Sequence, residues 1–110
     1  MTRDSRDLLY GSVDMLVLRA LAWEPMHGYA IASWIDQRTD GVLTIEDAAL
    51  YKALHRLERQ GRVDGEWGVT EGNRRAKFYR LTAAGRRTLR EETVAWRAYA
   101  DAVQRILEPA

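Results

Sequence analysis

The stretch that decides the fold is residues 46–80, EDAALYKALHRLERQGRVDGEWGVTEGNRRAKFYR. At about 100° per residue, its first half places three leucines on one helical face and three cations on the opposite face. The leucines are Leu50, Leu54 and Leu57, and the cations are Lys52, Arg56 and Arg59. An apolar stripe opposite a basic one predicts a helix that packs on a core and presents cations outward. A solvated surface helix and a DNA-binding helix both fit this pattern.

The residues after this helix predict a β-hairpin. Gly61 is typical of a helix end, because glycine adopts the left-handed cap without steric cost. Residues 63–69 and 77–81 then alternate with a period of two, as strands do. Glu71, Gly72 and Asn73 supply turn chemistry between them, in a loop longer than two residues. A basic helix followed by a protruding hairpin is the arrangement of a winged helix, with the hairpin as the wing.

Charge is distributed unevenly along the chain, although its formal net charge is only +1. Residues 1–50 contain four arginines and eight acidic residues, whereas residues 52–90 contain 11 basic and four acidic residues. The cations therefore concentrate on the predicted helix and hairpin. This is the electrostatic footprint expected of a surface that binds nucleic-acid phosphates.

Two shorter helices are predicted upstream. The first has a core-facing stripe of Val13, Leu16, Val17, Ala20 and Leu21, and Pro25 follows it. The second opens at His27 and Gly28, turns Ile31, Trp34 and Ile35 inward, and ends before Gly41. Residues 43–45, Leu-Thr-Ile, predict a short strand beside the hairpin. We therefore predict a mainly α, α+β winged helix-turn-helix, with three helices and a two- or three-stranded wing, followed by a long C-terminal helix.

The C-terminal segment predicts a dimerisation helix. Thr82 is a favourable N-cap, and residues 83–107 contain no helix breaker, so they would span about 38 Å. An apolar stripe near a/d spacing runs along this helix and consists of Leu89, Trp96, Tyr99, Val103, Ile106 and Leu107. One small domain offers no second surface for so long a stripe, so we expect a homodimer. The chain then divides into a DNA-binding domain, residues 1–81, and a dimerisation helix, residues 82–110.

Composition bounds the class of protein. The chain has 110 residues, 46% hydrophobic residues and no cysteine, which indicates one folded domain with an appended helix and excludes disulfides and thiolate metal sites. No apolar run approaches the roughly 18–20 residues of a membrane span, and residues 1–9 are charged, so we expect a cytoplasmic protein. Two separated histidines and no catalytic motif argue against an enzyme, a metal or a cofactor.

Several motifs resemble the PadR family of bacterial transcription regulators. They are Tyr10-Gly11, Pro25-Met26-His27-Gly28-Tyr29, Leu50-Tyr51, Ala53-Leu54-His55-Arg56-Leu57-Glu58, Lys77-Phe78-Tyr79-Arg80-Leu81-Thr82 and Gly85-Arg86. Residues 66–68 and 73–77 resemble a compact subgroup with a single C-terminal helix. The resemblance covers nearly the whole chain and implies a dimeric DNA-binding repressor, often responsive to a small molecule. Ala48-Ala49 and Lys52 depart from the Gly-Ser and Pro usual in the family, so base preference transfers less readily than DNA binding.

Candidate DNA contacts follow from these positions. Tyr51 and Lys52 lie near the start of the predicted recognition helix, where base edges are read, and cations farther along suit phosphates. The start of the second helix favours an anion. The candidate DNA-binding residues are His27, Tyr29, Ala49, Tyr51, Lys52, Arg56, Arg59, Asn73, Arg74, Arg75 and Lys77. Simpler roles stay open: the Tyr51 ring capping the core, His27 capping its helix, His55 as an ordinary rim residue, and the wing cations merely solvated.

Two further alternatives concern partners. A roughly palindromic double-stranded operator is expected if a symmetric dimer holds two recognition helices at a fixed separation. Trp96 and Tyr99 are either packing residues of the dimer interface or the wall of a pocket for a small, planar, apolar effector. The competing function is a winged helix that associates with proteins and does not read DNA sequence.

Overall fold

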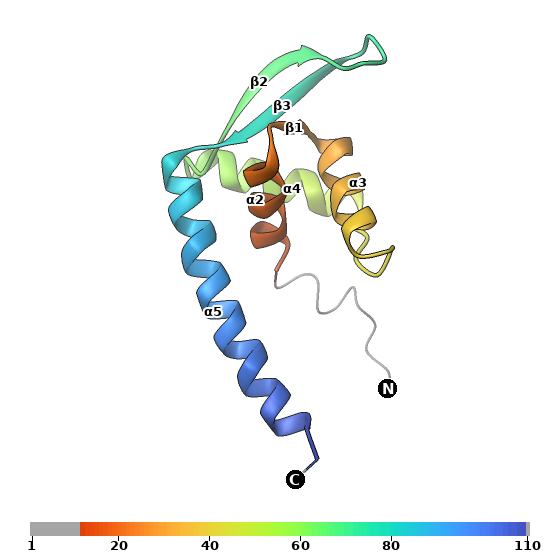
Figure 1. The fold of residues 1–110 in the computed structure, drawn as a ribbon. Helices are drawn as coiled ribbons and strands as arrows, with labels where there is room; N and C mark the ends of the chain where they lie inside the picture. The colour runs from red at the N-terminus through yellow and green to blue at the C-terminus, as the bar shows by residue number, and fades with distance from the viewer. Residues whose placement is uncertain (1–11, 110) are drawn as a thin grey trace.

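The computed structural model describes residues 12–109, in which four helices and a three-stranded sheet follow one another along the chain (Figure 1). The elements are α2 (Val13–Trp23), β1 (Met26–His27), α3 (Gly28–Arg38), α4 (Asp47–Arg59), β2 (Val63–Val69), β3 (Arg75–Leu81) and α5 (Ala83–Leu107). The predicted winged helix-turn-helix with a long C-terminal helix is confirmed. The motif Tyr10-Gly11 and residues 1–9 lie outside the described residues.

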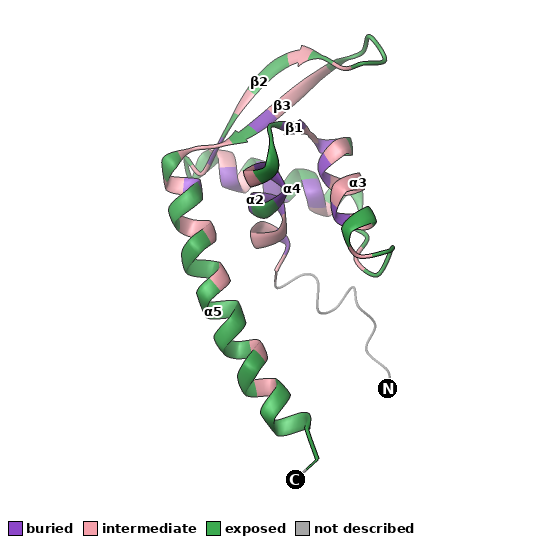
Figure 2. Cartoon of the chain, in the orientation of Figure 1, coloured by how far each residue is buried: buried purple, intermediate pink, exposed green. Residues whose placement is uncertain are grey.

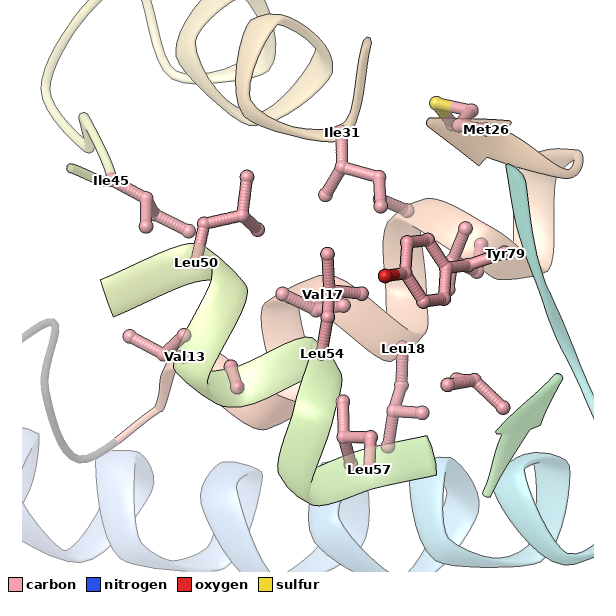
Figure 3. Close-up of a cluster of buried hydrophobic side chains, with 14 of the residues drawn as sticks. Val13, Val17, Leu18, Met26, Ile31, Ile45, Leu50, Leu54, Leu57 and Tyr79 are labelled. Atoms are coloured by element: carbon pink, nitrogen blue, oxygen red, sulfur yellow. The ribbon is translucent and has the colours of Figure 1, made fainter. Parts of the chain in front are cut away.

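The core forms where α2, α3 and α4 bring their apolar faces together (Figure 3). The leucine stripe of α4 is fully buried there, as its spacing predicts. Leu18 of α2 and Ile31 of α3 have no exposed surface, and each such side chain contributes about 1.5–3 kcal/mol when buried. Tyr79 joins them from β3, and burial raises the pKa of its hydroxyl. The wing is thus attached to the helices by an aromatic ring at its base.

The sheet has the strand order β1-β3-β2 and is antiparallel throughout. In the hairpin, Val63 pairs with Leu81 at the base and Val69 with Arg75 near the tip. The tip closes where the Thr70 amide donates to the Arg74 carbonyl at 2.8 Å, and Asn73 takes a positive φ of 61°. Asparagine tolerates this left-handed conformation better than most residues, which explains its use in the turn. The tip projects well beyond the helices (Figure 1).

The prediction of a strand over residues 43–45 is wrong, because the third strand is β1. Met26 pairs with Tyr79 and occupies the free edge of β3. Residues 43–45 instead form a loop tied to the end of α3. The Leu43 amide donates to Thr39 Oγ1 at 3.0 Å, and the Thr44 hydroxyl donates to Asp36 Oδ1 at 2.9 Å. The apolar residue that suggested a strand, Ile45, is buried as an anchor for this loop.

The junction between wing and α5 is closely packed. The Thr82 hydroxyl accepts a hydrogen bond from the Gly85 amide at 3.0 Å and donates one to the Gly61 carbonyl at 2.7 Å. Gly85 is buried, and a Cβ there would collide with the Arg62 carbonyl oxygen. Beyond Leu89, which packs against the core, α5 leaves the body as an arm that is mostly exposed (Figure 2). Its predicted helical span, residues 83–107, is confirmed, and the described part of the molecule measures 56 × 29 × 21 Å.

Candidate nucleic-acid interface

An open groove of about 1230 Å³ lies between the wing, the start of α3 and α4. Helix α3 contributes Tyr29, Ser33 and Gln37, which are four residues apart and so share one face. Helix α4 contributes Tyr51 and His55, one turn apart. The wing contributes Trp67, Val69, Arg74, Arg75 and Lys77. The predicted recognition helix, the helix before it and the wing therefore meet around one concave surface.

His27 begins α3 and caps it. The Ala30 amide donates to His27 Nδ1 at 3.3 Å, so the capping interpretation is confirmed. Since Nδ1 accepts this bond, the proton of the neutral ring lies on Nε2. The ring is held by an edge-on contact with Phe78, at a centroid distance of 5.2 Å. Tyr29, the next residue but one, is 79% exposed and lines the groove.

Tyr51 lies across the start of α3. A Cβ on Gly28 would come within 2.6 Å of the Tyr51 hydroxyl oxygen, so the absence of a side chain at Gly28 makes room for it. The Tyr51 side chain is 46% exposed, which places the ring at the groove wall and not within the core. The Tyr51 hydroxyl thus lies beside Gly28, at the start of α3.

The wing cations differ in their surroundings. Arg74 is exposed near the tip, beside Asn73. The Arg75 guanidinium carbon lies 5.0 Å from the centre of the Trp67 ring. Lys77 Nζ donates to Glu58 Oε1 of α4 at 2.9 Å, and this hydrogen bond raises the pKa of Lys77.

Lys77 therefore links the wing to the recognition helix as well as lining the groove. A Cβ on Gly65 would collide with Lys77 Cε, so a side chain at this position would force the lysine side chain to shift. Lys77 stays a predicted DNA contact and has, in addition, an ion pair with Glu58.

The cations of α4 share one helical face but differ in their partners. Lys52 and Arg59 are exposed but outside the lining of the groove, and Ala49 packs partly against the core. Arg56, a predicted DNA contact, has a partner within the chain. Its Nε donates to Asp14 Oδ2 of α2 at 3.0 Å, and the hydrogen bonding to this carboxylate raises the pKa of Arg56. The Arg56 side chain is directed toward α2 because Asp14 supplies a carboxylate there.

A second cavity, of about 360 Å³, lies where Arg56 and Asp14 face α5. Trp96 and Tyr99 form part of its wall, with ring centres 6.0 Å apart, and Glu92 lies beside them. This cavity thus adjoins both the recognition helix and the C-terminal arm.

The predicted dimerisation stripe is largely uncovered in the single chain. Tyr99 is 63% exposed and Ile106 83%, while Trp96 and Leu107 are also exposed and Val103 is partly exposed. Val94, which the a/d spacing omitted, is exposed as well. Leu89 is the exception, because it packs against the core of its own chain. The exposed part of the apolar stripe therefore begins after Leu89, farther along α5 than the sequence predicted.

Sequence reasoning did not select several groove residues, namely Ser33, Gln37, His55 and Trp67. The four-residue spacing from Tyr29 to Gln37 was a usable signal for α3. No sequence pattern predicted the place of Trp67. Alternation along a strand shows which residues share a face, but not which face of the hairpin lines the groove. Within residues 12–109, no three His, Asp or Glu side chains are grouped to bind a metal ion. Nor is any helix of that range both long and apolar enough to cross a membrane.

A recognition helix, a preceding helix and a wing around one groove define a winged helix-turn-helix protein. Residues 17–91 match the Transcriptional regulator PadR-like family, and the chain belongs to that family. An uncharacterized protein X of Lysinibacillus sphaericus is 30% identical over 103 residues, which are 93% of this chain and 94% of that protein.

Solved structures share the fold over most of the chain. A PadR family transcriptional regulator from Eggerthella lenta is 36% identical, with a TM-score of 0.79 over 96% of this chain and 90% of that one. A transcriptional regulator from Clostridium thermocellum is 27% identical, with a TM-score of 0.84 over 93% and 99% of the two chains. Bacillus subtilis PadR, in complex with operator DNA, is 20% identical over 74% of this chain and 46% of its own, with a TM-score of 0.66, and shows the fold alone.

Proposed function

We propose that the protein is a homodimeric, sequence-specific DNA-binding regulator that represses transcription in the bacterial cytoplasm. The observation that carries this proposal is the groove in which α3, α4 and the wing present polar and cationic side chains together. Family membership supports the regulatory role, and a PadR structure of the same fold bound to operator DNA supports duplex DNA as the partner.

The proposed binding mode places α4 in the major groove. Tyr51 and Lys52 lie in its N-terminal half, where they would meet base edges, and Ala49 would allow close approach. His27 and Tyr29 at the start of α3, and Arg59 at the end of α4, would contact phosphates. Asn73, Arg74 and Arg75 would follow the flanking duplex from the wing. Lys77 would hold the wing in place through Glu58, and Arg56, which also pairs with Asp14, would contact a phosphate from α4.

The proposed dimer forms through α5. Large apolar side chains on an exposed helix are energetically unfavourable in water, and a second copy would cover them. Trp96, Tyr99, Val103, Ile106 and Leu107 would form this interface. A two-fold dimer would hold two α4 helices at a fixed separation, and this predicts an operator with two inverted half-sites.

A second proposal concerns an effector. The cavity between α2, α4 and α5 has two aromatic walls, Trp96 and Tyr99, which suit a small planar molecule. Asp14, Arg56 and Glu92 make the rest of the lining charged, so the ring system of the molecule would carry polar groups. Because Arg56 of the recognition helix also lines the cavity, an occupant would contact the helix that reads DNA. Titration with planar aromatic compounds should quench tryptophan fluorescence and change operator affinity. The absence of both effects, or equal effects in a Trp96→Leu variant, would exclude the effector role.

Selection of bound sequences from a random duplex pool tests the DNA proposal. Purified protein should enrich a motif with two inverted halves, and sedimentation should give the mass of a dimer on that DNA. A protein-association module would enrich nothing. Variants with Tyr51→Ala or Lys52→Ala should change which bases are enriched, because these residues would face base edges.

A further inference from the structure

Trp67 lies on the wing and, unlike a core residue, exposes most of its surface to solvent. It is 59% exposed, although a tryptophan is among the largest apolar side chains. It lines the groove opposite the start of α3 and the face of α4 that carries Tyr51. Its exposure therefore lies on the surface that the proposed function assigns to DNA.

The hairpin register puts Trp67 and Arg75 on the same face. Val69 pairs directly with Arg75, and Trp67 lies two residues before Val69 on the same strand. Residues two apart on a strand share a face, and diagonal neighbours across a ladder lie within reach of long side chains. The guanidinium of Arg75 accordingly lies over the Trp67 ring, at 5.0 Å from its centre. Lys77, directly opposite Trp67, is instead directed to Glu58.

The comparison with Arg74 shows what the ring adds. Among residues 12–109, Arg74 has neither an ion pair nor a ring contact for its side chain, and it lies one position closer to the tip. An exposed arginine loses considerable side-chain freedom when it is fixed on a phosphate. A ring that already restricts the guanidinium reduces this loss and leaves its N–H edge free to donate.

We propose that Trp67 is a positioning residue for DNA binding, which holds Arg75 in the orientation that meets the backbone of the duplex. The inference rests on the proposed function and adds to it a residue that acts through another residue. Arg75 makes the contact, while Trp67 determines how readily that contact forms.

A double-mutant cycle on the selected operator tests this. Trp67→Leu keeps an apolar side chain but removes the ring. It should weaken binding about two- to fivefold per protomer, the size expected of an exposed cation–π contact, and hence about five- to 30-fold for a dimer with two wings. In an Arg75→Ala background the same change should have no effect. Trp67→Phe, which retains a ring, should bind within about twofold of wild type. In an Arg74→Ala background, Trp67→Leu should have its full effect.

Trp23→Leu is the matched control, because Trp23 is also exposed but lines neither the groove nor the second cavity. It should bind as wild type. An equal loss from Trp67→Leu with and without Arg75, or no loss at all, would overturn the proposal. Any effect of Trp67→Leu on stability enters both backgrounds and cancels in the cycle. Wild type that binds no duplex would overturn the proposed function itself, whereas binding without coupling overturns only this inference.

Discussion

At the scale of single residues, Gly28 and Tyr51 form the most closely constrained pair in the groove. The Tyr51 hydroxyl oxygen would be 2.6 Å from a Cβ at Gly28, so Gly28→Ala must displace the tyrosine. The displaced side chain is half-exposed and can move, and alanine is a better helix former than glycine. We therefore expect the free energy of unfolding to change by less than about 1 kcal/mol, while operator affinity falls about tenfold or more.

Urea unfolding and DNA titration of Gly28→Ala measure these two quantities side by side. Tyr51→Phe is the control, because it removes the hydroxyl without changing the backbone at Gly28. A large loss of stability, or unchanged affinity, would show that Gly28 serves the fold and not the placement of Tyr51.

The Lys77 ion pair gives the wing a dependence on pH. Because Glu58 accepts a hydrogen bond from the ammonium, the pKa of Lys77 is raised in the folded protein. The folded state thus holds this proton more tightly than the unfolded chain. Its stabilising effect is fully present below the ordinary lysine pKa of about 10.4 and is lost as pH rises through the folded value.

Unfolding curves of wild type and Lys77→Met between pH 8 and pH 11 isolate this effect. The difference in free energy of unfolding between the two proteins should shrink toward the alkaline end. Buried Tyr79 also has a raised pKa, and Lys77 partly lowers it, so the Tyr79 contribution differs between the two proteins. Both are therefore compared in a Tyr79→Phe background, in which the difference reports Lys77 alone. A difference that stays constant with pH would contradict the pairing.

At the scale of elements, the junction between the wing and α5 determines how the arm leaves the body. Thr82 caps α5 and simultaneously bonds the Gly61 carbonyl, where α4 has just ended. Thr82→Ala removes both bonds and should cost about 1–2 kcal/mol, the upper range for loss of an N-cap. Thr82→Ser should retain most of the stability, since it keeps the hydroxyl.

Thr93→Ala is the matched control on the same helix. The Thr93 hydroxyl bonds only the Leu89 carbonyl one turn earlier, which is already an acceptor within the helix. Its loss should change the free energy of unfolding by less than about 0.5 kcal/mol. Equal effects of Thr82→Ala and Thr93→Ala in urea unfolding would show that the junction contributes nothing specific.

For the molecule as a whole, sequence periodicity predicted the helices and strands more successfully than it predicted which strands pair with each other. The leucine stripe of α4 and the uninterrupted helix from Ala83 to Leu107 follow from local patterns, and the structure confirms both. The third strand does not follow from a local pattern. Residues 43–45 and residues 26–27 could both lie at the edge of β3, and only the packing shows that Met26 does. A two-residue strand such as β1 has too few residues to display a period.

Two long-range ion pairs explain why the surroundings of Arg56 and Lys77 could not be predicted from the sequence. Asp14 and Arg56 are 42 positions apart, and Glu58 and Lys77 are 19 apart, so nothing in the local sequence shows that either cation has a partner. Counting cations along the sequence identified residues 52–90 as the more basic part of the chain. It did not distinguish Arg74 and Arg75, which face the groove, from Arg56, which faces the second cavity.

The proposed dimer can be tested by placing a charge in the apolar stripe of α5. Ile106→Glu places a charge in the most exposed part of the α5 stripe and should abolish association, while the fold of residues 12–81 persists. Sedimentation should then give a monomer with operator affinity reduced by at least about 100-fold, because one half-site remains. Gln104→Glu adds the same charge to the same exposed segment but outside the proposed stripe, and should leave the dimer intact. A dimeric Ile106→Glu would contradict the proposed interface.

The salt dependence of operator binding is the measurement that separates sequence-specific binding through the groove from its alternatives. Wild-type affinity should fall steeply with salt. Arg74→Ala/Arg75→Ala removes four cations from the dimer, two in each wing, and should therefore reduce the slope of log affinity against log salt by about four. Arg86→Ala/Arg87→Ala removes the same charge from α5, outside the groove, and should leave the slope unchanged. A wild-type affinity that is equal on scrambled DNA, or a slope that the Arg74/Arg75 variant leaves unaltered, would contradict sequence-specific binding through this groove.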